Sequence, residues 1–415
     1  MSKYVIDNAK RCLQCKVPLC VKGCPVNTPI PDAIRLLLDS KVEQAGQLLF
    51  RNNPLSLACS YICPQENQCE GHCVLGRAGS PVQIGSIEQY ISDYYLNIYT
   101  PRVSAKNRGN VAIIGSGPAG ITIAFMLAEM DYNVTIFEGH DQIGGVLRYG
   151  IPEFRLPKSV LDRLKEKLLA VGVKIRPNTT IGANLEIEEL FRDGFQAIFV
   201  GTGVWRPNKL GIKGESLGHV HYAIEYLRSP DAYRLGKRVV IIGAGNVAMD
   251  VARTALRNGS KEVYIVCNMG QSTITAREIE VEYAKIDGAV FEFNKTAVEF
   301  VEEGVIFADS RIFTDENGNE RAEPISGTEQ LFLADSIIIA ISQGPRAVIV
   351  SSTKGLDTKE NGLVVTDDCG RTAREGIFAS GDVVTGAKTV VEAVRASYNV
   401  AGAIDEYITN IRERT

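Results

Sequence analysis

Short apolar runs, glycine-rich turns and helical stretches alternate along the middle of the chain. Val111–Ile114 is an apolar run that predicts a short buried strand, and Ile121–Met130 predicts the helix that follows it. Val134–Phe137 predicts a second strand. The same order returns at Arg238–Ile242 and, after another helical stretch, at Val263–Cys267. The pattern therefore predicts two strand–turn–helix–strand units, with one nucleotide-binding domain inserted into another.

The N-terminal part of the chain follows a different pattern. Ile30–Leu38, Val42–Phe50 and Ile84–Leu96 carry apolar residues at helical spacing, so we expect short helices there. Eight of the ten cysteines fall in the first 73 residues, in two ordered sets. The first set is Cys12-x2-Cys15-x4-Cys20-x3-Cys24-Pro25, and the second is Cys59-x3-Cys63-Pro64-x4-Cys69-x3-Cys73.

Such cysteine sets serve three different chemistries. A disulfide framework is typical of secreted domains that are too small to build a core, and here the cysteines precede a nucleotide-binding body. Zinc also uses Cys-x2-Cys pairs and stays an alternative. The two Cys-Pro steps, and four cysteines within the thirteen residues from Cys12 to Cys24, favour iron–sulfur clusters.

Composition narrows the class of protein. A chain of 415 residues is long enough for two or three domains, and 45% hydrophobic and 23% charged residues are ordinary for a globular protein. A net charge of −4 argues against a nucleic-acid partner. The N-terminus has no apolar leader and no run has transmembrane length, so we expect a cytoplasmic protein without a membrane partner.

The turn of the first unit is Gly115-x-Gly117-x-x-Gly120. In dinucleotide-binding folds the first such glycine allows the tight turn, the second lets the backbone approach a pyrophosphate, and the third lets helix and strand pack closely. Glu138 follows the second strand, 18 residues after Gly120, where an acid accepts hydrogen bonds from a ribose. The second unit has Gly243-x-Gly245 at the same place.

Two further motifs, in the segment Gly144–Lys158 and at Gly381-Asp382, resemble the flavin site of the glutamate synthase small-subunit family. That family includes the NAD(P)H-binding half of dihydropyrimidine dehydrogenase and the large subunit of the electron-bifurcating ferredoxin:NADP transhydrogenase. The resemblance covers nearly the whole chain, including the cysteine sets. It implies an α/β fold in which a helical domain with two [4Fe–4S] clusters precedes two Rossmann-like domains of the glutathione-reductase type.

The resemblance also implies domain boundaries and a flavin site. The iron–sulfur domain would span 1–108, the FAD-binding domain 109–228 and 344–415, and the inserted NAD(P)H-binding domain 229–343. The FAD pyrophosphate would be held by Gly115, Gly117, Pro118, Ala119 and Gly120, and its ribose by Glu138. Further along the cofactor the expected residues are Gly145, Val146 and Arg155, followed by Gly381 and Asp382 at the ribityl or phosphate region. Thr389 and Val390 would offer helix N-terminal amides to the pyrimidine edge of the flavin.

The same resemblance sorts the cysteines into two interleaved ligand groups. One cluster would be bound by Cys12, Cys15, Cys20 and Cys73. The other would be bound by Cys24, Cys63 and Cys69, with a fourth ligand that is not cysteine and that counting places at Glu88. An alternative stays open, in which Cys59 is the fourth ligand and Glu88 is a solvated helix residue.

The nicotinamide nucleotide is expected at Gly243, Gly245, Asn246 and Val247. NADP-using relatives place a basic pair after the second strand to bind the 2′-phosphate, and this chain has Asn268 and Met269 there. NADH is therefore favoured, and the nearby Arg277 keeps NADPH open. A second departure is the segment Ala396–Asn399, where relatives often have a glycine followed by a basic residue.

These motifs together predict a subunit that oxidises NAD(P)H and passes electrons through FAD and two clusters. Hydride transfer between nicotinamide and flavin needs stacking and distance control, so we expect no catalytic side chain. All recognisable segments are assigned, which predicts a separate electron-accepting subunit that docks at the N-terminal domain. Two other classes compete. They are the NAD(P)-binding subunit of an electron-bifurcating complex, such as a transhydrogenase, hydrogenase or formate dehydrogenase assembly, and a non-enzymatic zinc-bearing nucleotide sensor.

Overall fold

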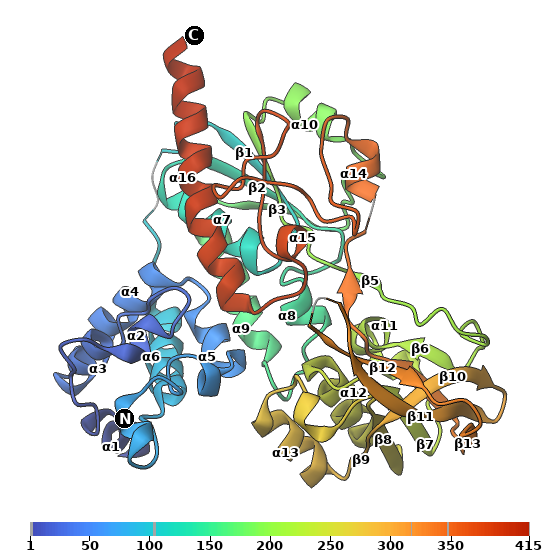
Figure 1. Cartoon of the computed structure of the whole chain (residues 1–415). Helices are drawn as coiled ribbons and strands as arrows, with labels where there is room; N and C mark the ends of the chain where they lie inside the picture. Colours follow the sequence, from blue (N-terminus) through green and yellow to red (C-terminus); the bar gives the residue numbers. More distant parts are fainter. Residues whose placement is uncertain (1–2, 103–104, 317, 347, 415) are drawn as a thin grey trace. The chain divides into compact units, whose positions relative to one another are not determined.

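The N-terminal part of the chain folds into helices, as its apolar pattern predicts (Figure 1). They are α1 (Lys3–Lys10), α2 (Leu19–Lys22), α3 (Ile30–Leu38), α4 (Val42–Asn52), α5 (Ser56–Ile62) and α6 (Ile84–Ile98). Ile34, Leu49 and Ile91 from three of these helices share one buried core. At Gly46 the backbone of α4 crosses α6 so closely that a Cβ atom would lie 2.2 Å from the Cβ of Tyr95.

This computed structural model describes residues 3–102, 105–316, 318–346 and 348–414. The chain divides into two compact units, of which the first comprises Met1–Leu147, Glu153–Val204 and Pro345–Thr415, and the second Arg148–Pro152 and Trp205–Gly344. The helical segment and the first nucleotide sheet thus belong to one unit. The boundary expected at 108/109 falls inside it and stays a prediction.

The first unit contains a five-stranded sheet in the order β16-β4-β1-β2-β3. Its strands are β1 (Asn110–Ile114), β2 (Asn133–Phe137), β3 (Lys174–Arg176), β4 (Ala197–Val200) and β16 (Ile377–Ala379), and all pairs are parallel. Helix α7 (Pro118–Glu129) connects β1 to β2. The strand order reverses at β1, and in open parallel sheets ligands bind outside the carboxyl ends of the strands at that point.

The last helix of the first unit is α16 (Val390–Arg414), of which the sequence pattern at Lys388–Val394 predicts only the start. Val394, Ala401 and Ile408 recur at helical spacing on its buried face. The helix packs against α7, where the Ser397 hydroxyl donates to the Ala119 carbonyl over 3.4 Å. Two elements whose sequence motifs are assigned to the flavin are thereby held against each other.

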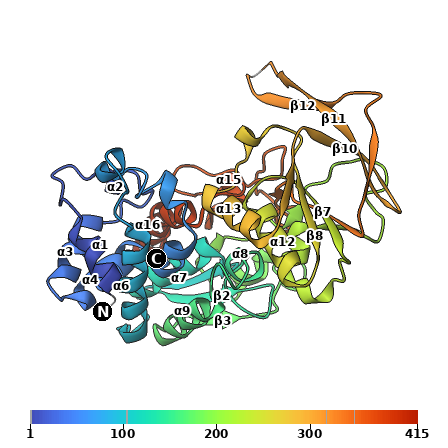
Figure 2. The same cartoon turned by 90° about the horizontal axis from the view of Figure 1, so that it is seen from below.

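The second unit repeats the parallel sheet in the order β6-β14-β7-β8-β9. Its strands are β6 (Val220–Tyr222), β7 (Arg238–Ile242), β8 (Glu262–Val266), β9 (Val290–Glu292) and β14 (Ser336–Ile339), and helices α12 (Asn246–Arg257) and α13 (Glu278–Asp287) cover one face. An antiparallel layer packs on the other face (Figure 2): β10 (Lys295–Val301), β11 (Gly304–Thr314), β12 (Glu320–Pro324) and β13 (Gln330–Leu333). The predicted internal repeat is thus present in the fold.

A buried ion pair joins the two helices of the second unit. The Arg253 guanidinium of α12 donates to Glu280 of α13 over 2.7 Å and to Asp287 over 3.0 Å. The guanidinium also lies over the ring of Tyr283, 5.0 Å from its centroid. Because Arg253 and Glu280 are both less than a tenth exposed, this pair fixes α13, and the segment just before it, against α12.

The remaining elements are short connections around the two sheets. They are α8 (Val146–Tyr149), α9 (Lys158–Ala170), α10 (Ile187–Arg192), α11 (Ala223–Arg228), α14 (Val348–Ser352), α15 (Asp382–Thr385) and the two-stranded pair β5 (Arg206–Pro207) with β15 (Gln343–Gly344). Within the described ranges, no helix is both long and apolar enough to cross a membrane.

Candidate functional site

In the glycine loop after β1, two glycines have no room for a Cβ atom and one does. A Cβ atom at Gly115, where φ is +94°, would lie 2.6 Å from the Gly201 carbonyl oxygen, and one at Gly120 would lie 2.0 Å from the Gly115 carbonyl oxygen. A Cβ atom at Gly117 would meet no atom within 4 Å. Since Gly117 caps the N-terminus of α7 and Pro118 begins it, the helix amides face open space that fits a pyrophosphate.

Two distant segments of the first unit reach the same loop. The Gly144 amide donates to the Ser116 carbonyl over 3.0 Å, and a Cβ atom at Gly145 would lie 2.8 Å from the Gly117 Cα. A Cβ atom at Gly381 would lie 3.2 Å from the Ala119 Cβ. The structure therefore brings together three of the motifs that the sequence assigns to the flavin.

Glu138 lies beside this loop and is only 5% exposed. One carboxylate oxygen accepts hydrogen bonds from the Ser116 amide, over 2.9 Å, and from the Ser116 hydroxyl. The other accepts from the His140 amide and ring Nδ1, over 2.8 and 2.9 Å. Burial raises the pKa of Glu138, but these hydrogen bonds together outweigh it and leave the pKa below its ordinary value. The carboxylate stays ionised, and Ser116 and His140 already fill its four acceptor sites, so a ribose hydroxyl would bind there only in place of one of these donors, of which the Ser116 hydroxyl can rotate away. Sequence reasoning missed Ser116 and His140.

Asp382 and Thr389 lie at the start of the two last helices. Burial raises the pKa of Asp382 to about 6, and its carboxylate accepts from the Lys388 amide over 3.3 Å. The Thr389 amide and hydroxyl both donate to the Glu392 carboxylate, over 3.0 and 2.6 Å, so Glu392 reaches back and satisfies the amide that precedes α16. The Thr389 amide is thus engaged within the chain. The Thr-x-x-Glu spacing was the sequence signal for this contact.

The other two residues assigned to the flavin lie between β2 and α9. Val146 is the first residue of α8, directly after Gly145. Arg155 is half-buried and lies in the segment that leads to α9.

The glycine loop of the second unit has the same geometry but is covered. A Cβ atom at Gly243, where φ is +129°, would lie 2.4 Å from the Ala340 carbonyl oxygen. The nearest neighbour of a Cβ atom at Gly245 is the Thr275 hydroxyl, at 3.7 Å. The Ala276 amide donates to the Ala244 carbonyl over 3.1 Å, and the Arg277 amide to the Asn246 side chain over 3.0 Å. Asn246 and Val247 begin α12, and the segment 275–277 lies across their loop.

At the end of β8, a different residue holds the position that Glu138 has at the end of β2. The Cys267 amide donates to the Glu292 carbonyl over 2.8 Å, as the Glu138 amide donates to the Arg176 carbonyl over 2.9 Å in the first unit. Cys267 therefore occupies the position that corresponds to Glu138. It is 5% exposed, and burial raises its pKa to about 11, so the thiol is neutral.

The residues after Cys267 are uncharged as well. Asn268 and Met269 follow it, and the Asn294 amide donates to the Met269 carbonyl over 3.3 Å. A Cβ atom at Gly270 would lie 3.9 Å from the Asn294 side-chain oxygen. The side chains of Asn268, Met269 and Asn294 at this end of β8 are thus all uncharged.

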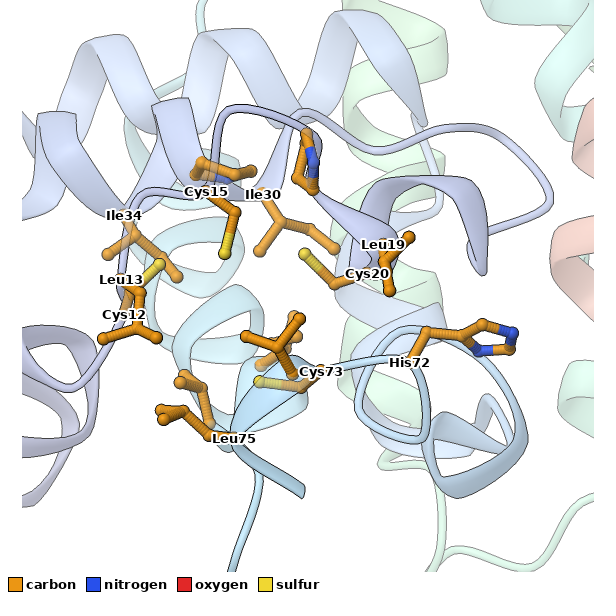
Figure 3. Close-up of a pocket in the computed structure, with 15 residues that line it drawn as sticks. Cys12, Leu13, Cys15, Leu19, Cys20, Ile30, Ile34, His72, Cys73 and Leu75 are labelled. Atoms are coloured by element: carbon orange, nitrogen blue, oxygen red, sulfur yellow. The ribbon is translucent and has the colours of Figure 1, made fainter. Parts of the chain in front are cut away.

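Four cysteines line one pocket between the first helices of the chain (Figure 3). They are Cys12, Cys15, Cys20 and Cys73, the group expected to bind the first cluster, and the sulfur atoms of Cys15, Cys20 and Cys73 point toward its middle. The rest of the lining is mostly apolar: Leu13, Pro18, Leu19, Ile30, Pro31, Ile34, His72, Val74, Leu75, Val82 and Ile84. Burial raises the pKa of Cys12, and that of Cys20 to about 11.

The second group of cysteines gathers around a carboxyl group. Burial raises the pKa of Glu88, on α6, to about 8. Burial, followed by the proximity of Glu88, raises the pKa of Cys69. Glu88 also raises the pKa of Cys24 and Cys63, although burial has the larger effect on Cys24 and a hydrogen bond to Cys59 has the larger effect on Cys63. The structure thus brings the four expected ligands together.

Cys59 lies against this second group. It is 2% exposed, makes the hydrogen bond to Cys63, and accepts from the Asn53 side-chain amide over 3.3 Å. The choice between Cys59 and Glu88 as the fourth ligand therefore stays open on geometry alone.

The raised thiol pKa values bear on what these groups hold. Thiolates buried without cations are unfavourable, and binding of a cationic iron–sulfur core would release the thiol protons and compensate the charge. The donor set of thiols and one carboxyl group fits such a core. Among the described residues, no three His, Cys, Asp or Glu side chains lie close enough to hold a single metal ion.

Comparison with known proteins agrees with this division of the chain. Residues 1–99 match the family described as dihydropyrimidine dehydrogenase domain II, 4Fe-4S cluster, and residues 109–397 match the pyridine nucleotide-disulphide oxidoreductase family. The glutamate synthase [NADPH] small chain of Halomonas elongata is 33% identical over 425 residues, which cover 96% of this chain and 90% of that protein. This chain belongs to the glutamate synthase small-chain family.

Two further relatives show the range of that family. The NAD-dependent dihydropyrimidine dehydrogenase subunit PreT of Salmonella typhimurium is 33% identical, with 97% of this chain and 94% of that protein covered. The NADP(+)-dependent formate dehydrogenase subunit beta of Moorella thermoacetica is 32% identical, with 94% and 60% covered. The family assignment makes this chain an NAD(P)H-dependent flavoprotein oxidoreductase with iron–sulfur and FAD cofactors.

Solved structures support the fold. FprA from Mycobacterium tuberculosis, in complex with NADPH, has a TM-score of 0.62 at 18% identity, with 74% of this chain and 86% of that chain covered. The thioredoxin reductase of T. acidophilum has a TM-score of 0.55 at 22% identity, with 72% and 98% covered.

Substitutions at the first glycine loop separate flavin binding from folding. Gly117→Ala places a methyl group in open space, so the unfolding free energy of the apoprotein should hardly change, while FAD affinity falls by more than about tenfold. Gly120→Ala drives a methyl group into the Gly115 carbonyl and should destabilise the apoprotein by about 1–3 kcal/mol. Fluorescence titration with FAD and urea unfolding measure the two effects. Unchanged FAD affinity in Gly117→Ala would contradict this assignment.

Proposed function

We propose that this chain is the NAD(P)H-oxidising electron-input subunit of a larger reductase of the glutamate synthase or dihydropyrimidine dehydrogenase type. The observation that carries the proposal is the gathering of Cys12, Cys15, Cys20 and Cys73 around one pocket, in the same unit as the open glycine loop. FAD, when bound, accepts a hydride from the nicotinamide and releases its electrons one at a time, as iron–sulfur clusters require.

The residues of the chain hold and orient these groups. Gly117 and the amides of α7 provide the anion site for the FAD pyrophosphate, and ionised Glu138 accepts from its ribose once the Ser116 hydroxyl has rotated away. In the second unit, the loop Gly243–Val247 binds the nucleotide phosphates under the segment 275–277. The apolar lining of the Cys12 pocket excludes water from the first cluster, and half-buried Glu88 supplies a fourth, anionic ligand to the second.

We also propose that the electron acceptor is a separate subunit. The relatives named above are a small chain of glutamate synthase, a subunit of dihydropyrimidine dehydrogenase and a beta subunit of formate dehydrogenase, which supports a partner for this chain. The Cys12 pocket is the side on which we place the partner, because Leu13 in its lining and Val17 in the same loop are 62% and 58% exposed. Large apolar side chains in such positions are typical of interfaces.

The test is the cofactor content and reactivity of the purified chain. Two four-iron groups predict about eight irons and eight acid-labile sulfides, with one FAD per chain. The chain alone should reduce artificial dyes with NAD(P)H yet fail with glutamine plus 2-oxoglutarate, or with uracil. Stoichiometric zinc without broad visible absorbance would refute the proposal. Turnover of a physiological small substrate by the chain alone would refute its status as a subunit.

The fourth ligand of the second cluster is tested by a pair of substitutions. Glu88→Ala removes the carboxyl group that lies among Cys24, Cys63 and Cys69, so it should change the EPR signal of one cluster and leave the other unchanged. Cys59→Ser keeps a small polar side chain against Cys63 and serves as the matched control. If Cys59→Ser changes the signal and Glu88→Ala does not, Cys59 is the ligand.

We further propose that the chain prefers NADH. A 2′-phosphate needs charge-assisted hydrogen bonds, and the positions after β8 are Cys267, Asn268 and Met269, with Asn294 beside them. The side chain that would hold a ribose hydroxyl in the second unit is a neutral thiol, since burial raises the pKa of Cys267. One cation, Lys295, lies at this corner, since its amide donates to the Cys267 carbonyl over 3.1 Å, but its ammonium pairs with Asp309 over 2.5 Å. With neutral side chains at Cys267, Asn268 and Met269, NADPH binding is weakened without being strongly rejected.

Nucleotide preference should follow the charge at this corner. Stopped-flow measurements are expected to show faster flavin reduction with NADH than with NADPH. Replacing Asn268 and Met269 together by arginines should shift the preference toward NADPH, by roughly 1–3 kcal/mol for each charge-assisted bond gained. Glu316→Gln together with Glu320→Gln, far along the chain in and beside the β11–β12 hairpin, adds the same net charge and serves as the control. A wild-type preference for NADPH of about tenfold or more would overturn the proposal.

A further inference from the structure

Tyr398 lies in the segment Ala396–Asn399, whose departure from the family pattern the sequence left without a function. It belongs to α16, about two turns after the first residue, Val390. Its hydroxyl donates to the backbone carbonyl of Asn52, the last residue of α4, and lies 3.4 Å from the Arg51 carbonyl. Burial raises the pKa of Tyr398 to about 12, so the phenol stays protonated and acts as a donor.

From Asn52 a hydrogen bond continues to the loop of a cysteine. The Asn52 side-chain amide donates to the Val26 carbonyl over 2.9 Å. Val26 lies two residues after Cys24 in the same loop, and the Cys24 sulfur lies 3.2 Å from the Thr28 hydroxyl two residues further on. Two hydrogen bonds and this short loop therefore connect α16 to Cys24, a proposed ligand of the second cluster.

The last turn of α4 also contacts the helix of the pyrophosphate loop. The ring of Phe50 packs edge-on against Phe125 of α7, with centroids 5.4 Å apart, and lies 4.6 Å from the ring of Tyr99. The residues Phe50–Asn52 thus contact both α7 and α16, the two helices whose N-termini are assigned to the flavin.

Other contacts between the helical segment and the flavin sheet begin from α6. Arg163 donates to Asp93 over 2.7 Å and to Asn97 over 2.8 Å, and the Tyr99 hydroxyl donates to Glu129 over 3.2 Å. Asp93 and Asn97 lie after Glu88 on α6, and Tyr99 directly follows the end of that helix. Among the cross-contacts named here, the hydroxyl of Tyr398 is the one that continues into a cysteine loop.

We propose that Tyr398 is a positioning residue that locks the Cys24 loop to α16, and so holds the second cysteine group in a fixed relation to the flavin side of the unit. The inference rests on the proposed function, because it assigns a cluster to that group. It gives the unusual segment Ala396–Asn399 a role: a phenol can reach the α4 backbone and donate one directed hydrogen bond there. The residue acts through Asn52 and does not contact the reacting atoms.

The experiment compares Tyr398→Phe with Tyr407→Phe in the cofactor-loaded protein. Both remove one hydroxyl from α16, and the Tyr407 ring packs on Phe378 of the FAD sheet, 5.7 Å away, instead of on α4. In Tyr398→Phe, the EPR signal assigned to the second cluster through Glu88→Ala should shift and broaden, while the signal of the first cluster stays unchanged. Amide hydrogen exchange at residues 24–28 should quicken by about three- to tenfold, the loss of one hydrogen bond. Tyr407→Phe should match wild type in both measurements.

A second variant breaks the same series of contacts at the next hydrogen bond, between Asn52 and Val26. Asn52→Leu removes the link to Val26, so its effects on the EPR signal and on exchange should resemble those of Tyr398→Phe. Because the links act in series, the double variant should be no worse than either single variant. Additive effects would contradict the series, as would equal changes in both clusters.

The outcomes also separate the two proposals. Wild-type protein that lacks iron or FAD refutes the proposed function itself. Loaded wild-type protein, with Tyr398→Phe equally loaded and unchanged in its second-cluster signal and in exchange at residues 24–28, refutes only the positioning role.

Discussion

Burial of anionic ligands is the constraint on which the N-terminal helical segment of this structure depends. Cys63, Cys69 and Glu88 lie close together; the hydrogen bond with Cys59 raises the pKa of Cys63, and burial raises the pKa of Cys69 and of Glu88. Such groups ionise together only when a cationic core compensates them, since an unpaired buried charge costs several kcal/mol. The apolar core around Ile34 and Leu49, built by α3, α4 and α6, supplies the framework for the site that we propose to be completed by metal.

The two glycine loops show one architecture adapted to two tasks. Both follow the central strand of a parallel sheet and begin a helix, and both close tightly at their first glycine. They differ at the residue after the second strand, which is ionised Glu138 in one unit and the neutral thiol of Cys267 in the other. An ionised acid held in place by hydrogen bonds, as Glu138 is, suits a cofactor that stays bound. A site with fewer strong acceptors, as at Cys267, suits a nucleotide that must leave after each turnover.

Much of this arrangement could be predicted because it is local in sequence. The strands at Val111–Ile114 and Val134–Phe137 and the helix at Ile30–Leu38 follow from apolar spacing alone, and the family assignment confirms the fold. The approach of Gly145 to Gly117 and the contact from Tyr398 to Asn52 join residues far apart in the chain, which no local pattern encodes. The full length of α16 was missed for a related reason: its buried face is defined by α7, against which it packs.

The buried pair of Arg253 and Glu280 constrains how this protein can evolve. Replacement of Arg253 alone removes the cation that faces buried Glu280, replacement of Glu280 alone leaves Arg253 paired with Asp287, and replacement of both by apolar side chains can be tolerated. The intermediate that lacks only Arg253 is the unfavourable one, so substitutions at the two positions should be inherited together among related chains. An alignment in which Arg253 is often lost while Glu280 is kept would show that another cation has taken over its role. We therefore expect the facing residues of α12 and α13 to change together at these two positions.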